Sequence, residues 1–458
     1  MQASMRPARS DFGAMMRECG QLAQLALPLV FANLGGIAIA TTDMLMLGHA
    51  GPKALAAVAL ALSIFQPLML LCVGIGLAVT PLVTAARARH QTRQIRRVVR
   101  QGVWMALFQT MLCAPVFWFS GTIFSAIGQD ADLAAHAQLY TRGVLPGLFF
   151  ILLFNVLRSY LTALERTRAV LILTLLAIPL NAVLNGILIF GAGPIPALGV
   201  LGAAIGSTLS NAAMAIGISV HCSRRRPFRR HALFSRFWRP DWSTFLELHR
   251  LGLPIGMMIV LEVAVFAGTA QLMGLIGTLE LAAHQIAIQL ASITFMVPLG
   301  VGQAATARVG IVDGRGERHR LARVGWAAML LSTGFMGCTG LAFWLVPGLL
   351  VRPFLDGSDA SSTVMALAGS YLAVAAAFQI VDGMQVTAAH VLRGLQDTRV
   401  PMWIAAFGYW GVAMPCAWFL GLHTSLQGRG IWFGLALGLA VCAILLARRL
   451  HRRLRVVS

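Results

Sequence analysis

Twelve long apolar stretches alternate with short polar loops along the chain. They lie roughly at residues 22–45, 54–85, 101–121, 134–158, 169–191, 197–221, 248–275, 280–309, 324–349, 361–391, 401–421 and 430–447. About 20 apolar residues in a helix cross a bilayer, and longer stretches tilt or extend beyond it. The pattern therefore predicts an all-α polytopic membrane protein with twelve transmembrane helices.

The second half of the chain repeats marker residues of the first half at an offset of 226 positions. The pairs are Pro28 and Pro254, Gly48 and Gly274, Gly51 and Gly277, Gly74 and Gly300, Gly76 and Gly302, and Thr80 and Thr306. Proline and glycine constrain backbone geometry more than they carry side-chain chemistry. Their coincidence at one offset predicts a duplicated fold with six helices in each half.

Arginines gather in every second loop and at both termini, whereas the alternate loops carry few basic residues. Because such an excess marks the cytoplasmic side of a membrane protein, we expect both termini in the cytoplasm. With six spans each, the halves then share one orientation, as parallel repeats. We expect an N-terminal lobe at 1–222, a basic cytoplasmic loop at 223–247 and a C-terminal lobe at 248–458.

Composition narrows the function classes. The chain of 458 residues is 58% hydrophobic and 11% charged, a balance typical of a membrane protein rather than a soluble domain. The formal net charge of +20 does not indicate nucleic-acid binding, because the arginines lie in loops between apolar spans. The seven cysteines show no CxxC or His/Cys ligand spacing, so we expect neither a disulfide framework nor structural zinc.

The basic loop at 223–247 and its flank carry aromatic residues among the arginines. These are Phe228, Phe234, Phe237, Trp238 and Trp242. Two interpretations stay open. The loop binds anionic membrane headgroups, which would make membrane lipids partners of the protein, or it is a solvated linker that only obeys the charge rule.

Three acidic residues fall within apolar spans: Asp43 in the first, Glu262 in the seventh and Asp382 in the tenth. A charged carboxylate inside a membrane costs several kcal/mol, so such residues pair, stay protonated or serve a function. We expect no basic side chain within the C-terminal spans to neutralise Glu262 and Asp382. These two acids therefore predict a bound cation, a proton or a cationic cargo.

Amide side chains accompany the acids. Gln379, Asp382 and Gln385 recur every three residues and share one helix face. Asn181 and Asn185 lie one turn apart, where they either line a pathway or join helices. Gln285 is a further candidate pathway residue at the start of the eighth span.

Catalytic signatures such as HExxH, GxSxG, the P-loop and the GxGxxG turn are absent from the sequence. We therefore expect no enzyme activity and no cofactor. Since nothing supplies energy from ATP, active transport by this chain would draw on an ion gradient.

The sequence resembles the multidrug and toxic compound extrusion (MATE) transporters, most of all their NorM-like branch. The similar positions are Leu27-Pro28, Thr42-Asp43, Gly48, Ala56-Ala57-Val58, Gln66-Pro67, Gly74-Ile75-Gly76, Glu262, Ala282-Ala283-His284-Gln285, Asp382 and Leu392-Arg393-Gly394. They cover nearly the whole chain in the family's order.

The resemblance implies a V-shaped pair of six-helix lobes in a bacterial inner membrane, working as a monomer. It implies export of small amphipathic, mostly cationic compounds in exchange for Na⁺ or H⁺. The coupling cation, with Na⁺ as the candidate metal, would bind at Glu262 and Asp382. The choice between Na⁺ and H⁺ stays open.

The resemblance also implies roles in the N-terminal lobe. Asp43 matches the proton site of the related DinF-like branch, and Pro28 matches its helix-bending residue. That branch has an acid where this chain has Asn185. Some NorM-like members have a tyrosine one turn before the acid of the tenth span, where this chain has Phe378, so one possible oxygen ligand for the cation is lost. Phe378 remains a candidate pathway residue.

The main alternative is an exporter or flippase of a lipid-linked or other endogenous metabolite within the same superfamily. An anionic cargo of that kind would favour basic side chains in the central spans. Arg142 is the one candidate that the apolar pattern offers, which favours drug export over this alternative.

Overall fold

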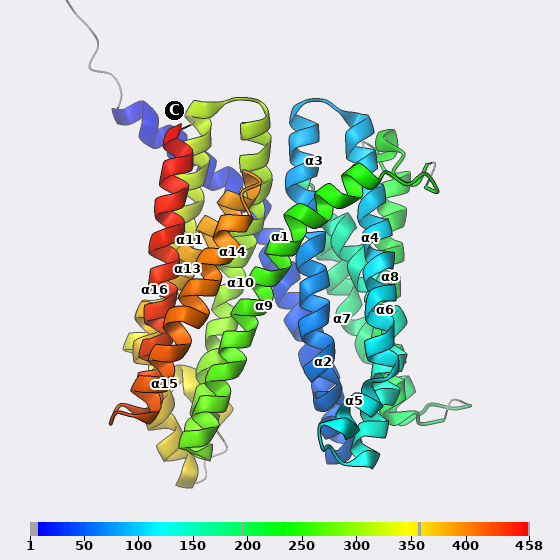
Figure 1. Cartoon of the computed structure of the whole chain (residues 1–458), viewed down its shortest axis with the longest axis vertical. Helices are drawn as coiled ribbons and strands as arrows, with labels where there is room; N and C mark the ends of the chain where they lie inside the picture. The colour runs from blue at the N-terminus through cyan, green and yellow to red at the C-terminus, as the bar shows by residue number, and fades with distance from the viewer. Residues whose placement is uncertain (1–7, 195, 227, 236, 356–358, 457–458) are drawn as a thin grey trace, which may run out of the picture. The chain divides into compact units, whose positions relative to one another are not determined.

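The computed structural model describes residues 8–194, 196–226, 228–235, 237–355 and 359–456, and its regular structure in these ranges is helical (Figure 1). The first half contains α1 (Ala8–Ala50), α2 (Pro52–Gly76), α3 (Val79–Ala88), α4 (Thr92–Trp118), α5 (Ser120–Ala126), α6 (Ala131–Ala163), α7 (Arg168–Phe190), α8 (Gly199–Arg224) and the 3-10 turn η1 (Phe228–His231).

The second half contains α9 (Trp242–Ile276), α10 (Thr278–Gly314), α11 (Arg318–Leu345), α12 (Pro347–Val351), η2 (Arg352–Phe354), α13 (Asp359–Gly394), α14 (Arg399–Ala406), the π-helix η3 (Phe407–Ala413), α15 (Met414–Leu422) and α16 (Gln427–Val456). Within the described ranges, eleven helical segments are long and apolar enough to span a membrane, and the pair α4–α5, bent by 48°, makes a twelfth. The predicted multi-pass, all-helical architecture is confirmed.

Both halves start their second span immediately after a glycine of the repeat. Gly51 precedes α2 and Gly277 precedes α10, at the predicted offset. Gly51 has φ 120°, a conformation that L side chains rarely adopt. At Gly277, whose backbone is extended, a Cβ atom would meet only the carboxylate of Glu280, the movable end of a side chain. The conformational need for glycine therefore holds at Gly51 and not at the equivalent break.

The chain divides into two compact units: unit 1 contains residues 1–30 and 258–458, and unit 2 contains residues 31–257. This division differs from the lobes expected at 1–222 and 248–458. The reason is that α1, with 43 residues, and α9, with 35, are continuous helices whose two ends pack in different units.

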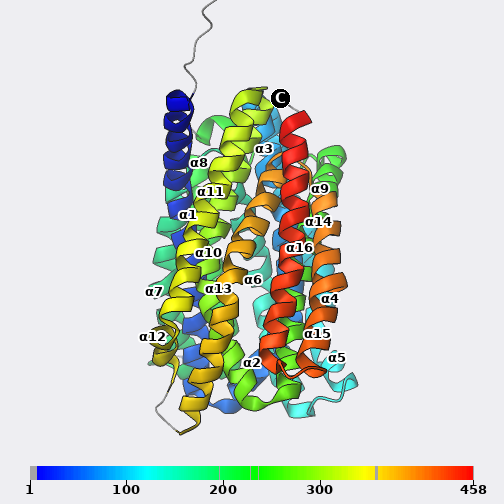
Figure 2. The same ribbon diagram turned by 90° about the vertical axis from the view of Figure 1, so that its left-hand side faces the viewer.

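Each unit is built around the fourth span of its half. In unit 2, α6 packs against α2, α4 and α8. In unit 1, α13 packs against α10, α11 and α16, as Figure 2 shows. These partners are the second, third and sixth spans of their respective halves, so the sequence repeat is also a repeat of packing.

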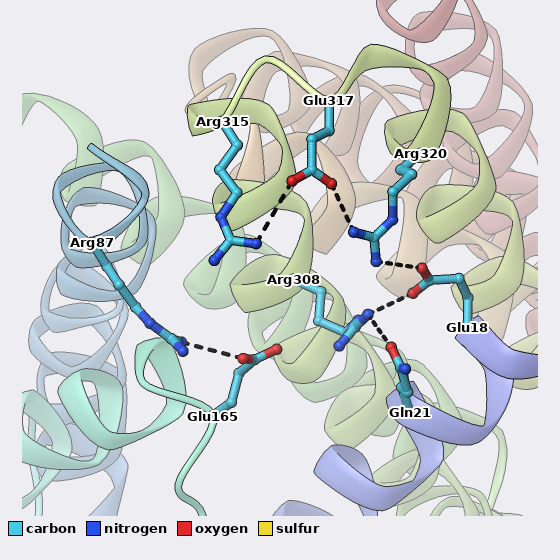
Figure 3. Close-up of polar contacts among 8 residues, drawn as sticks. All are labelled: Glu18, Gln21, Arg87, Glu165, Arg308, Arg315, Glu317 and Arg320. Carbon is cyan, nitrogen blue, oxygen red and sulfur yellow. Dashed lines mark hydrogen bonds and ion pairs between the residues drawn. The ribbon is translucent and has the colours of Figure 1, made fainter. Parts of the chain in front are cut away.

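Buried ion pairs attach the start of α1 to unit 1 (Figure 3). The Glu18 side chain is 7% exposed and accepts from Arg308 on α10 at 2.6 Å and from Arg320 on α11 at 2.8 Å. Arg308 also donates to Gln21 Oε1 at 2.5 Å. Charge-assisted bonds to a largely buried carboxylate fix the position of this helix end.

We predict that Glu18→Gln destabilises unit 1. Breaking a fully buried pair costs about 3–5 kcal/mol; because Arg320 is 32% exposed, we expect a loss of about 1–3 kcal/mol in the free energy of unfolding. Thermal unfolding of the detergent-solubilised protein measures it.

The control is Glu317→Gln, which removes a more exposed carboxylate that also pairs with Arg320, at 2.7 Å. We expect a loss of at most about 1 kcal/mol there, because exposed pairs contribute little. Equal losses for both variants would contradict a special role for Glu18.

Candidate functional site

Two carboxylates of unit 1 approach each other from different helices. Glu262 lies in the middle of α9 and Asp382 lies two-thirds of the way along α13. Each lies within electrostatic range of the other. Asp382 is 5% exposed, whereas Glu262 is only half-buried. The structure thus brings together the two acids that the sequence analysis selected as one pair.

A basic residue also lies near this pair, against our expectation. Arg393, in the last turn of α13, is 6% exposed and lies within electrostatic range of Glu262. Its Nη1 lies 3.2 Å from Nε2 of His390, one turn earlier. The apolar pattern placed Arg393 in a loop, but α13 continues through Gly394 and carries it into the bundle. Two carboxylates beside one guanidinium keep a net negative charge when both are ionised.

Tyr409 is a member of this site that the sequence analysis missed. It is fully buried and lies within electrostatic range of both Glu262 and Asp382. Its hydroxyl lies beside Glu262 without reaching hydrogen-bond geometry with a described partner. Tyr409 belongs to η3, and π-helical segments inside helices are frequent at functional sites. The sequence did contain a signal for this segment, because Gly408 and Gly411 flank Tyr409 and Trp410 within an apolar span.

The two glutamines near Asp382 are fully buried on α13. Gln379 donates through Nε2 to Thr294 Oγ1 at 2.6 Å, which leaves its Oε1 without a partner in the described part of the chain. Gln385 has no described partner for either amide atom. Buried polar atoms are normally hydrogen-bonded, so these amide groups are candidates to contact a transported ion or substrate.

The remaining predicted residues of unit 1 lie in contrasting environments. Phe378 is 1% exposed and forms edge-to-face contacts with Trp432, at 5.8 Å between centroids, and with Phe266, at 6.3 Å. Gln285 is exposed on α10. A pathway role for both stays a prediction.

In the described ranges, no group of three or more His, Cys, Asp or Glu side chains could hold a metal ion. A cation at Glu262 and Asp382 would need the amide and hydroxyl oxygens as well.

Asp43 forms a second polar site, within unit 2. Its Oδ1 accepts from Asn185 Nδ2 at 2.5 Å and its Oδ2 accepts from Ser207 Oγ at 3.1 Å. Asn185 also donates to Asn181 Oδ1 at 3.5 Å, and both asparagines are fully buried. The asparagines therefore join α7 to the acid on α1. Ser207, on α8, was not predicted.

Pro28 lies within the continuous α1, where a proline removes one backbone hydrogen bond. The division between the two units falls two residues later, after Val30. A bending role for Pro28 stays a prediction, and its position is suited to one.

Basic side chains inside the helices are more numerous than the apolar pattern indicated. Arg142 is partly exposed, donates to the Trp118 carbonyl at 3.0 Å and lies 4.8 Å from the centre of the Trp118 ring. Arg158 on α6 donates to Asn33 Oδ1 at 2.5 Å. The expectation that Arg142 is the one such candidate was wrong, because Arg158, at the last position of the predicted fourth span, lies inside α6, which continues to Ala163.

Known proteins resemble the chain over its whole length. The profile of the MatE family matches residues 28–187 and 254–419. A probable multidrug resistance protein NorM from Mesorhizobium japonicum is 42% identical over 463 residues, covering 100% of this chain and 98% of the relative. Another protein of that name, from Burkholderia mallei, is 35% identical, covering 98% and 96%.

Solved structures share the fold. A multidrug resistance MATE family transporter in an outward-facing conformation superposes with a TM-score of 0.87 at 19% identity, covering 96% of each chain. A eukaryotic MATE transporter gives 0.83 at 22% identity, covering 96% of this chain and 99% of that one. A MOP superfamily transporter from Pyrococcus furiosus, whose binding pocket is described as reversed in polarity with a different function suggested, gives 0.85 at 18% identity, covering 96% of each chain.

Proposed function

The chain belongs to the MATE family of transporters, and from this premise we propose that it exports amphipathic, mostly cationic drugs in exchange for Na⁺ or H⁺. The relatives named as multidrug resistance proteins support drug export. One observation in the molecule supports the proposal of antiport. Two carboxylates, Glu262 and Asp382, lie together inside unit 1 beside polar atoms without described partners.

The coupling cation competes with cargo through the conformations of the transporter. A cation that binds one conformation more tightly than the other shifts the population toward the first by that difference in affinity. Cation entry and drug release are then coupled free energies, each changing the other by the same factor. One charge moving inward through a potential of 100 mV supplies about 2.3 kcal/mol.

The residues of the acid pair have distinct roles in this proposal. Glu262 is the less buried acid of the pair, and it would meet the cation first. Asp382 is the deeper ligand, at 5% exposure. When no cation is bound, Arg393 stabilises the site by balancing part of the negative charge of the two carboxylates. The partnerless amide oxygens of Gln379 and Gln385 complete the set for Na⁺, whereas H⁺ needs the carboxylates alone.

A second candidate is export or flipping of an endogenous anionic metabolite, such as a lipid-linked precursor. Arg158 and Arg393, both carried inside helices, favour it more than the sequence pattern did. The Pyrococcus furiosus structure is a fold relative for which a different function is suggested. The proximity of Glu262 to Arg393 counts against a free anion site at that position.

We further propose that the protein resides in a bacterial inner membrane and works as a monomer. The bacterial origin of the named relatives supports the location. The high apolar content and the arginine-rich loops suit a lipid bilayer with the termini in the cytoplasm.

The proposal is tested with the purified protein in liposomes that contain a fluorescent organic cation. We expect an imposed inward gradient of either Na⁺ or H⁺ to drive efflux at least about tenfold faster than no gradient, since one charge at 100 mV already provides more than the roughly 1.4 kcal/mol that tenfold requires. An ion that drives efflux is the coupling ion. No acceleration by either ion, together with uptake of an anionic lipid precursor analogue, would favour the second candidate.

A further inference from the structure

The loop before α9 is attached to α4 by an aromatic contact within unit 2. Trp104 donates through Nε1 to the carbonyl of Phe237 at 3.0 Å. Their rings stack with centroids 5.7 Å apart and planes 14° apart. Arg96 adds a bond to Ser235 Oγ at 3.3 Å. The loop therefore lies against α4 and is not a freely solvated linker.

Basic side chains concentrate where this loop meets α4. Arg100 lies within electrostatic range of Arg96, Arg97, Arg239 and Asp241. Arg97 Nε lies 3.7 Å from Asp241 Oδ2, and the Arg97 side chain is 56% exposed. Four positive charges beside one negative charge leave three positive charges in excess. The patch therefore favours an anion.

Asp241 stays charged in this patch. Partial burial alone would raise the pKa of Asp241, but hydrogen bonds from Ser243 and Thr244 hold it below its ordinary value. The same carboxylate accepts from the Thr244 amide at 3.2 Å at the start of α9. It neutralises one arginine over the whole range near neutral pH, so the excess of positive charge does not depend on small pH changes.

An exposed apolar strip begins at the basic patch and continues along α9 and α4. Trp238 and Trp242 are 75% and 67% exposed. The Trp242 ring lies 5.7 Å from that of Phe245, which lies 5.8 Å from that of Phe108 on α4. Further exposed side chains of these helices are Leu246, Met111 and Leu112. Tryptophans are typical of the membrane interface, between headgroups and acyl chains.

We propose that this basic patch and apolar strip form a binding site for one anionic diacyl phospholipid of the cytoplasmic leaflet. Arg97 and Arg239 contact the phosphate, Trp238 and Trp242 lie at the level of the glycerol, and the acyl chains follow Phe108 and Leu112. The site combines positive charge with an adjoining apolar surface, a combination that fits a lipid better than a soluble anion. It does not depend on the transported cargo.

The test is native mass spectrometry of the full-length protein in detergent, titrated with dioleoyl phosphatidylglycerol or dioleoyl phosphatidylethanolamine. We expect the wild type to bind the anionic lipid more tightly, and less so as salt is raised. Arg97→Gln with Arg239→Gln should weaken phosphatidylglycerol binding about 25-fold, from about fivefold per arginine near a membrane surface. Trp242→Ala should weaken binding of both lipids, because both use the apolar strip.

The matched control is Arg166→Gln with Arg168→Gln, which removes two exposed arginines of unit 2 at the start of α7. We expect less than a twofold change. The single variant Arg239→Gln, with an expected fivefold loss, keeps the test valid if the double variant is not monodisperse. Equal losses in the two double variants, or no preference for the anionic lipid in the wild type, would overturn the proposal.

Discussion

Glu262→Gln and Asp382→Asn are each expected to reduce gradient-driven efflux at least tenfold while leaving the folded protein in the membrane. Each substitution keeps the size of the side chain and removes the charge that a cation needs. Loss of a charged partner costs more than the roughly 1.4 kcal/mol that corresponds to a factor of ten. Dye efflux from proteoliposomes under an imposed Na⁺ or H⁺ gradient measures the effect.

The effect of replacing Gln379 distinguishes a site that binds Na⁺ from a site that binds H⁺. If Na⁺ is the coupling ion, we expect Gln379→Leu to weaken coupling as well, because its Oε1 has no partner in the described part of unit 1 and is available to the ion. If H⁺ is the coupling ion, that amide contributes little and the variant should retain most of its activity.

Glu280→Gln is the matched control for the acid pair. It makes the same chemical change in the first turn of α10, away from the middle of the span. We expect efflux within twofold of the wild type. Wild-type rates from both Glu262→Gln and Asp382→Asn would show that the coupling ion binds elsewhere, and Asp43 in unit 2 would become the leading candidate.

Gly434→Val is expected to cause the largest loss of stability among single substitutions considered for unit 1. Gly434 lies in the Gly430, Gly434 and Gly438 stripe of α16. A Cβ at Gly434 would lie 2.5 Å from Ala417 Cα on α15 and closer still to its backbone nitrogen. Small residues in such stripes let membrane helices approach closely.

The backbone of α15 cannot move as a flexible side chain does, so the two helices must separate. Overpacking of this kind costs about 1–3 kcal/mol or more, which corresponds to a fall in Tm on the order of 5 °C. Thermal unfolding followed by size-exclusion chromatography measures it, and a lower yield of monodisperse protein should accompany it.

Gly334→Val on α11 is the control. A Cβ at Gly334 meets nothing within 4 Å. The intrinsic effect of valine on a helix is the same at both positions, so the difference between the variants isolates the contact between α15 and α16. Similar Tm values for the two would indicate that this contact is not close in the membrane.

The apolar pattern predicted the architecture well because it is a local property of the chain. Each span must bury its backbone in lipid, so its length and composition appear directly in consecutive residues. The 226-residue offset located equivalent helix starts after Gly51 and Gly277, and packing around α6 and α13 follows the same repeat.

Helix ends were less predictable. Apolar stretches end before the helices do, because arginines and polar residues continue a helix past the hydrocarbon region. For this reason the predicted spans end at Arg158 and before Arg393, although α6 and α13 continue to Ala163 and Gly394. The lobe boundaries shifted for a related reason, since α1 and α9 each run through two units.

The sequence by itself determined that this chain crosses a membrane about twelve times, that its halves are duplicated, and that Glu262 and Asp382 are unusual within apolar spans. Only the tertiary structure decided which side chains from distant helices meet: Tyr409 and Arg393 near Glu262, Asn185 and Ser207 on Asp43, and Trp104 against Phe237. Span length and charge bias are properties of neighbouring residues and can be read from a short stretch of sequence. Contacts between distant helices depend on how the helices rotate and pack, which no single stretch of sequence specifies.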